Sequence, residues 1–185
     1  MLSCATPVAP SAWKRSTPPV APGAVPKETY VGGSRTVEAG GRVAKLTHVN
    51  NAHTDGDTFV YFADANVLAT GDLMSNTKRY QSIDFANGGD IRGVIRAMDA
   101  MLAVANADTK VVTGHGGPAT RADIEEYRAM LLIAHTRVEK LFNEGKSEED
   151  VMAAKPLKDL DEKWALNDTA AAAFLKMVYN SYKRS

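Results

Sequence analysis

The sequence has little cysteine and no long apolar run. Cys4 is the one cysteine among 185 residues, which excludes an internal disulfide framework. A membrane-spanning helix needs about 20 consecutive apolar residues, and no segment approaches that length. No apolar core of a secretory signal stands near the first residue either. A cytoplasmic protein with no membrane partner is therefore the default expectation.

An excess of one charge is also absent. The 22 lysines and arginines equal the 22 aspartates and glutamates. The chain has no charge run of either sign, and no basic stripe interleaved with aromatic residues. Proteins that bind nucleic acid or anionic lipid commonly carry such a stripe. Nucleic acid is therefore not an expected partner.

Two parts of the chain differ in composition. Residues 1–26 hold six of the eight prolines and show neither a helical nor a strand period. This composition predicts a disordered or loosely extended tail. Residues 27–185 have the apolar periodicity of one globular domain, and they are numerous enough to bury a core.

The pattern within residues 27–185 predicts a layered α/β protein. A Gly-Gly pair at residues 40–41 joins two alternating segments, which is typical of a β-hairpin. Apolar residues on both faces of the next strands indicate a sheet covered on both sides. The predicted strands are residues 34–38, 42–49, 58–62, 66–68 and 110–113. The predicted helices are residues 91–106, 120–143, a short helix between 147 and 155, and 169–182.

Two histidines and an aspartate stand where strands end. His53 opens a polar turn, Asp72 is expected on the turn after residues 66–68, and His115 follows the strand at 110–113 on a glycine-rich turn. Glycines let the backbone turn sharply and leave an imidazole open to a ligand. Imidazole and carboxylate are ligands that zinc accepts, so the three residues predict a metal site. A structural role for His53 stays open as the alternative.

The other two histidines are expected to be structural. His48 lies within the strand at 42–49, where it is a packed or surface face residue. His135 lies one residue away from the apolar stripe of the helix at 120–143, which predicts a solvated surface position. The loop at 79–89 follows Asp72 and is expected to line the mouth of the metal site.

Residues 25–185 resemble the C-terminal half of a metallo-β-lactamase-fold metallo-hydrolase. The motifs that carry the resemblance are Ala-His-Thr-Asp-Gly-Asp at 52–57, Val-Tyr-Phe at 60–62, Ala-Asn-Val-Leu at 65–68, Thr-Gly-Asp at 70–72, Gly-Gly at 88–89, Gly-His-Gly at 114–116 and the segment 121–131. The resemblance implies about half of an αββα sandwich, namely its C-terminal β-α-β-α part. It also implies a hydrolase of small molecules, with two zinc ions that share an activated water.

Carried over by position, the resemblance implies a role for each candidate ligand. His53 would bind the first zinc, Asp72 would bridge both metals and orient the attacking hydroxide, and His115 would bind the second zinc. Asp72 would therefore be catalytic as well as metal-binding. Members of this branch are often exported proteins.

The chain departs from this family at one motif. A His-x-His-x-Asp-His sequence, which supplies the other ligands, is absent, so each metal would keep one histidine and the shared aspartate. Catalytic zinc sites normally use three protein ligands. Three hypotheses follow: a metal-dependent hydrolase, a non-catalytic remnant that needs self-association as a homo-oligomer or a complementary half, and a binding module whose mouth lies between Asp55, Asp72 and His115.

Overall fold

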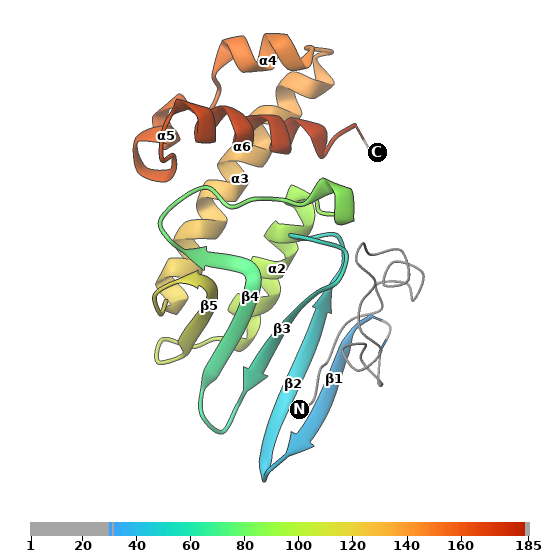
Figure 1. Cartoon of the computed structure of the whole chain (residues 1–185), viewed down its shortest axis with the longest axis vertical. Coiled ribbons are helices and arrows are strands. Elements are labelled where there is room, and N and C mark those ends of the chain that lie inside the picture. Colours follow the sequence, from blue (N-terminus) through green and yellow to red (C-terminus); the bar gives the residue numbers. More distant parts are fainter. Residues whose placement is uncertain (1–29, 31, 184–185) are drawn as a thin grey trace, which may run out of the picture.

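A five-stranded mixed sheet forms the centre of the computed structural model, which describes residues 30 and 32–183 (Figure 1). The strands are β1 Ser34–Ala39, β2 Arg42–Val49, β3 Asp57–Phe62, β4 Val67–Asn76 and β5 Lys110–Gly116. They lie side by side in chain order. Neighbours from β1 to β4 are antiparallel, whereas β5 runs parallel to β4. The predicted tail at residues 1–26 lies outside the described residues.

The helices lie behind the sheet and beyond one of its ends (Figure 1). They are the short η2 Phe85–Asn87, α2 Ile91–Val104, α3 Arg121–Asn143, α4 Glu148–Ala154, α5 Lys158–Trp164 and α6 Asp168–Asn180. Helices α2 and α3 cover the back of the sheet, and α3 continues upward to the group formed by α4, α5 and α6. The predicted α/β class is therefore confirmed. None of these helices, within the described part of the chain, is long and apolar enough to cross a membrane.

Local sequence signals explain the first and longest elements. Gly40 and Gly41 both have positive φ, +60° and +74°, and the β1–β2 hairpin needs this conformation in its two-residue turn. Helix α3 begins with a capping box, in which Thr120 accepts a hydrogen bond from the backbone N–H of Asp123 while the Asp123 carboxylate accepts one from Thr120. Both elements confirm the predictions.

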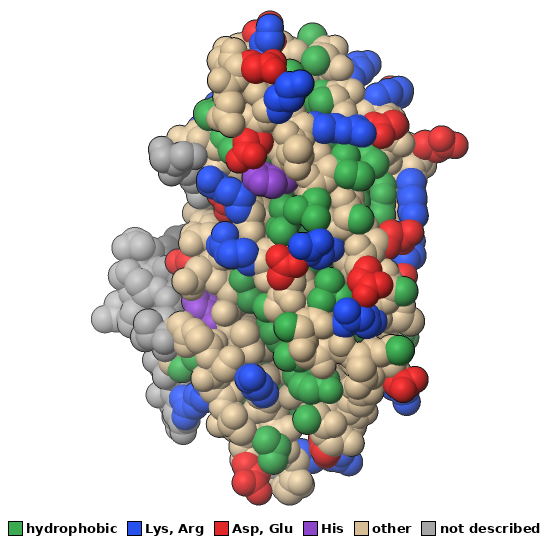
Figure 2. Space-filling view, turned by 180° about the vertical axis from the view of Figure 1, so that it is seen from behind, with side chains coloured by type: hydrophobic (Ala, Val, Ile, Leu, Met, Phe, Trp, Pro, Cys, Tyr) green, Lys and Arg blue, Asp and Glu red, His purple; other side chains and the backbone are tan. Residues whose placement is uncertain are grey.

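The core lies between the sheet and the helices. Phe59, Leu68 and Val111 are almost fully buried on the helix side of three neighbouring strands, against methionines of α2 such as Met98 and Met101. Figure 2 views the molecule from this helix side, where Lys and Arg side chains are interleaved with Asp and Glu. The even mixture of charges on this side agrees with the balanced composition.

Described helices cover only the back face of the sheet (Figure 1), so the expectation of a sheet covered on both sides stays a prediction for the other face. The helix-free face carries an apolar row across four strands, in which Leu46, Val60, Ala69 and Val112 are successive partners in the pairing register. No described helix or strand lies over this row (Figure 1). Val112 is 53% exposed, whereas Leu46 is only 4% exposed. The apolar pattern on both faces was read correctly, but only the back face has its cover among the described residues.

Strand β4 is longer than predicted. It continues from Val67 to Asn76, so Asp72 lies within the strand rather than on a turn after it. The pairing with β5 is irregular between Gly71 and Ser75, and Gly71 has a φ of +53°. An irregularity of this kind re-aims side chains without ending the strand. The Thr-Gly-Asp sequence was therefore misread as a turn.

Helix α5 was not predicted. Leu157 at its N-cap, Leu160 and Trp164 stand at helical spacing after Pro156, and they pack into the core. The helix is short, Lys158–Trp164. Pro156 indicates where the preceding helix ends, but it does not indicate where the next helix begins. This helix matters for the site because it holds the segment beside Asp72.

Candidate metal site at the end of the sheet

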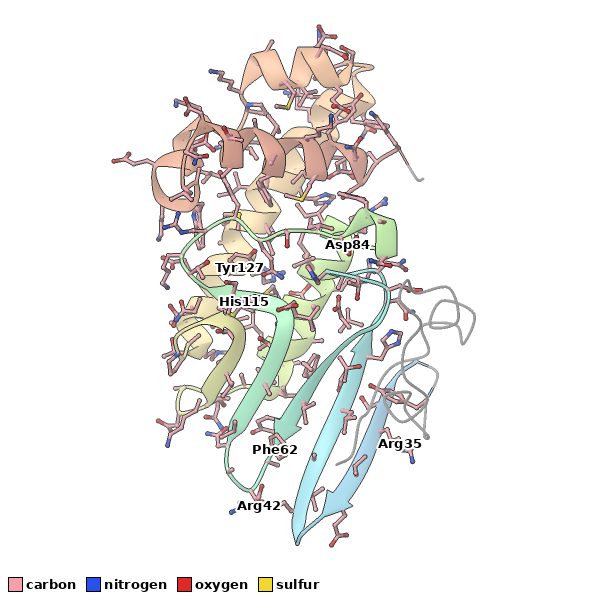
Figure 3. All side chains as sticks on the ribbon, viewed as in Figure 1. Arg35, Arg42, Phe62, Asp84, His115 and Tyr127 are labelled. Atoms are coloured by element: carbon pink, nitrogen blue, oxygen red, sulfur yellow. The ribbon has the colours of Figure 1, made fainter. Side chains whose placement is uncertain are left out.

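All three predicted ligands line one cavity of about 610 Å³. Figure 3 shows His115 at the end of the sheet that faces α5 and α6, whereas Phe62 and Arg42 lie toward the opposite end. The complete lining is His53, Asp72, Ser75, Thr77, Tyr80, Gln81, Ser82 and His115. Segments far apart in the sequence therefore meet at one sheet end.

Asp72 and His115 are in direct contact. The Nε2 atom of His115 lies 3.2 Å from Oδ1 of Asp72, and their side chains are 72% and 48% exposed, His115 first. The parallel pairing of β4 with β5 brings the two residues together. A side chain at position 114 would overlap Oδ1 of Asp72 and would lie 2.7 Å from the backbone of Gly71. Gly114 is therefore required for this contact.

His53 is held from its other ring nitrogen. Its Nδ1 atom lies 2.8 Å from the backbone carbonyl oxygen of Ser82. A carbonyl oxygen only accepts, so Nδ1 must carry the proton in this hydrogen bond, and the neutral ring has an unprotonated Nε2. Metal-binding histidines are oriented in this way by a backbone carbonyl on the second nitrogen.

The loop that carries His53 is fixed by its own hydrogen bonds. The carboxylate of Asp57 accepts hydrogen bonds from the Thr54 backbone N–H at 2.7 Å and from the Thr54 hydroxyl at 3.1 Å. Burial raises the pKa of Asp57, and the two hydrogen bonds from Thr54 oppose that shift. On the far side, Asp84 donates its backbone N–H to the carbonyl of His53 at 2.8 Å, and the side chain of Asn87 lowers the Asp84 pKa. Asp57 and Asp84 therefore shape the loop.

The remaining two histidines have structural contacts. His48 lies in β2 and its Nε2 donates to the carbonyl of Asp55 at 2.9 Å, which confirms the structural interpretation. The prediction of a solvated His135 was wrong. His135 is half-buried, its ring stacks on Tyr182, and its Nδ1 contacts the Tyr182 hydroxyl. Tyr182 follows helix α6 and is 47 positions from His135 in the sequence. The polar residues next to His135 could therefore not indicate this contact.

The described residues do not by themselves fit a closed zinc site. No group of three His, Cys, Asp or Glu side chains comes close enough to hold a metal ion in the part of the chain that the structure describes. Asp72 and His115 meet, while His53 lines the same cavity without joining them. The three-ligand set therefore stays a prediction. Imidazole and carboxylate groups are ligands that zinc accepts, but the three side chains do not lie close enough together to hold one ion.

Most residues of the cavity wall were not predicted from the sequence. The expectation that the loop at 79–89 lines the mouth is confirmed through Tyr80, Gln81 and Ser82. The individual roles of Gln81 and Ser82 were missed, since these residues act through contacts with residues 9 and 29 positions away. No periodicity in the sequence marks such contacts.

Comparison with known proteins gives a fold. No protein-family model matches the sequence, and no curated protein does. Among solved structures, the stereoselective inverting sec-alkylsulfatase Pisa1 of Pseudomonas sp. matches with a TM-score of 0.64 and 20% identity, over 85% of this chain and 27% of that chain. A metallo-β-lactamase family protein of Thermus thermophilus matches with a TM-score of 0.54 and 18% identity, over 86% of this chain and 50% of that one. The chain has part of the metallo-β-lactamase fold.

The match is partial on the side of the known structures. The chain spans 27% of the length of the sec-alkylsulfatase and 56% of the B3 metallo-β-lactamase BLEG-1, which it matches with a TM-score of 0.50 and 21% identity over 65% of its own length. The five-stranded mixed sheet and the helices that follow it correspond to this part of the metallo-β-lactamase fold. The resemblance seen in the motifs from 52–57 to 121–131 is therefore confirmed at the level of the fold.

Proposed function

We propose that the chain carries one side of the metal centre of a zinc-dependent hydrolase of the metallo-β-lactamase superfamily, which acts on a small molecule. The observation that carries the proposal is the shared cavity of His53, Asp72 and His115 at one end of the sheet. Metal-dependent hydrolases use a bound metal to lower the pKa of water and to stabilise the oxyanion that forms. The names of the matching structures, a sec-alkylsulfatase and metallo-β-lactamases, agree with this class of reaction.

The chain's own residues prepare the site in two ways. The carbonyl of Ser82 keeps the Nε2 atom of His53 free of a proton, so this nitrogen is ready to donate to a metal. The contact of His115 with Asp72 brings an anionic oxygen and an imidazole nitrogen to one place. Zinc binding there would release any proton that His115 holds on Nε2. A centre with two metals and three protein ligands for each would need ligands beyond these three residues.

Zinc content of the purified full-length chain tests this proposal. After removal of metal with a chelator and dialysis against zinc, elemental analysis is expected to give about one zinc ion per chain, together with a thermal midpoint that rises with zinc concentration. Less than about a tenth of a zinc ion per chain, with no shift of the midpoint, would refute the hydrolase proposal for this chain.

A second function is favoured by the helix-free face. We propose, as the alternative, a non-catalytic module whose half-buried and exposed apolar residues Val60, Ala69 and Val112 are covered by the same face of a second copy. Sheets pack face to face about 10 Å apart through apolar side chains, and Val60, Ala69 and Val112 form a row of that kind across three neighbouring strands. The 53% exposure of Val112 leaves it accessible to such a contact.

The mass of the chain in solution tests this alternative. Light scattering at several protein concentrations is expected to report a dimer, and Val112→Lys is expected to weaken it because burial of an unpaired ammonium group is unfavourable. Leu166→Lys is the matched control, since Leu166 is 63% exposed and lies between α5 and α6. A monomer at all concentrations, or a dimer that only Leu166→Lys weakens, would contradict pairing through the sheet face.

A further inference from the structure

Residues 80–83 connect the helices to the candidate site, and we call this segment the site strap. Its outer contacts are with α5 and α6. The backbone N–H of Tyr80 donates to the carbonyl of Trp164 at 2.6 Å, and the Tyr80 ring stacks on Phe174 with ring centres 4.1 Å apart. The Tyr80 hydroxyl donates to Asp161 at 3.0 Å, and the backbone N–H of Ile83 lies 3.3 Å from the sulfur of Met177.

The inner contacts of the strap are with two predicted metal ligands. The side-chain amide of Gln81 donates through Nε2 to the backbone carbonyl of Asp72. The backbone carbonyl of Ser82 accepts the hydrogen bond from Nδ1 of His53 at 2.8 Å. The outer and the inner contacts are made by the same four consecutive residues. A movement of α5 or α6 would therefore be transmitted to His53 and Asp72 through this one segment.

Gln81 has a feature that stability does not explain. The residue is only 7% exposed and lines the cavity. Its Oε1 atom is buried with no hydrogen-bond partner among the described residues. A buried acceptor without a partner is destabilising, and in a native protein such a group calls for an explanation, of which a functional role is one. A core that served stability alone would place an apolar side chain here.

We infer that Gln81 and Ser82 are positioning residues, which fix Asp72 and His53 for the site, and that α5 and α6 set their position through Tyr80 and Phe174. The inference rests on the proposed function for the use of these ligands, but the positioning itself is a property of the metal-free chain. It therefore has one test that needs no metal and one that does.

The metal-free test reads the proton on His53. Long-range proton–nitrogen NMR correlations of the four imidazoles are expected to show the His53 proton on Nδ1, because the Ser82 carbonyl accepts a hydrogen bond there. His53→Gln assigns the signal. Phe174→Leu is expected to lose this single tautomer, because the strap loses its stacking partner. Phe142→Leu is the matched control, since Phe142 contacts Tyr179 and Tyr182 rather than the strap.

A milder variant covers the case in which Phe174→Leu does not fold. Phe174 is fully buried, whereas Tyr80 is half-buried, so Tyr80→Leu removes the same stack at lower cost to the core. Loss of the Nδ1 tautomer in either folded variant supports the strap. An unchanged tautomer of His53 in Tyr80→Leu would overturn the link to α5 and α6.

The second test separates positioning from stability at Gln81. Gln81→Met keeps the volume and removes both the donor and the unpartnered oxygen. We expect its thermal midpoint to be equal to or above that of the wild type, while its affinity for cobalt, read from the visible spectrum, falls about 10- to 100-fold. Thr109→Val, which changes a buried polar residue just before β5, at the end of that strand away from His115, is expected to leave the affinity unchanged.

The two tests fail in different ways. Equal cobalt affinity of Gln81→Met and the wild type would overturn the role of Gln81. A wild-type chain that binds no cobalt refutes the proposed metal site, while the tautomer of His53 still decides whether the strap positions this residue.

Discussion

Gly93→Ala is expected to lower the free energy of unfolding by about 3 kcal/mol or more, or to prevent folding. A Cβ atom at position 93 would overlap the backbone carbonyl of Asn51 and would lie 2.9 Å from Cα of Ala52. Both neighbours are backbone, so no side-chain rotation relieves the overlap. Alanine favours a helix over glycine by only about 1 kcal/mol, which is too little to offset it. Urea unfolding followed by circular dichroism measures the change.

The effect at Gly93 bears directly on the site. Helix α2 approaches residues 51–52 closely enough to exclude any side chain at Gly93, and Ala52 is fully buried there. His53 is the next residue, so this approach fixes where its loop begins. Gly117→Ala is the matched control, since nothing lies within 4 Å of a Cβ atom at Gly117 and its φ is not positive. Equal stability of Gly93→Ala and the wild type would contradict the close approach.

The fold was predictable wherever the signal is local. Two glycines with positive φ specify the β1–β2 hairpin, and Asp90 and Thr120 cap the helices α2 and α3 as their sequences indicate. Strand β4 was not predictable to its end, because its continuation beyond Gly71 depends on parallel pairing with β5. That pairing joins residues about 40 positions apart, and no short window of sequence contains it.

The candidate site likewise has one part that the sequence predicts and one part that it does not. His53, Asp72 and His115 were found because glycines and aspartates surround them in the sequence, and all three line one cavity. Gln81 was not predicted, because its hydrogen bond to the backbone carbonyl of Asp72 corresponds to no pattern of residue types in the sequence. The candidate site therefore combines side chains that motifs mark with a segment that only the tertiary structure reveals.

Asp72→Ala is expected to reduce zinc affinity by on the order of a hundredfold or more, because loss of a ligand exceeds the 10- to 100-fold cost of losing a hydrogen-bond partner of a ligand. The side chain of Asp72 is 48% exposed and its carboxylate contacts His115, which is itself largely exposed. Its removal is therefore expected to change the free energy of unfolding by no more than about 0.5 kcal/mol. Competition for zinc with a chelating dye measures the affinity.

A matched control makes the result at Asp72 specific. Asp64 has a side chain of similar exposure, 46%, but pairs with Arg42, whose label in Figure 3 stands at the opposite end of the sheet. Asp64→Ala removes the same charge and is expected to leave zinc affinity unchanged. If both variants lost affinity equally, the effect would be a general one of net charge. If Asp72→Ala kept its zinc, the metal would lie away from this cavity. Loss in Asp72→Ala alone would locate the metal beside His115, where β4 departs from regular pairing.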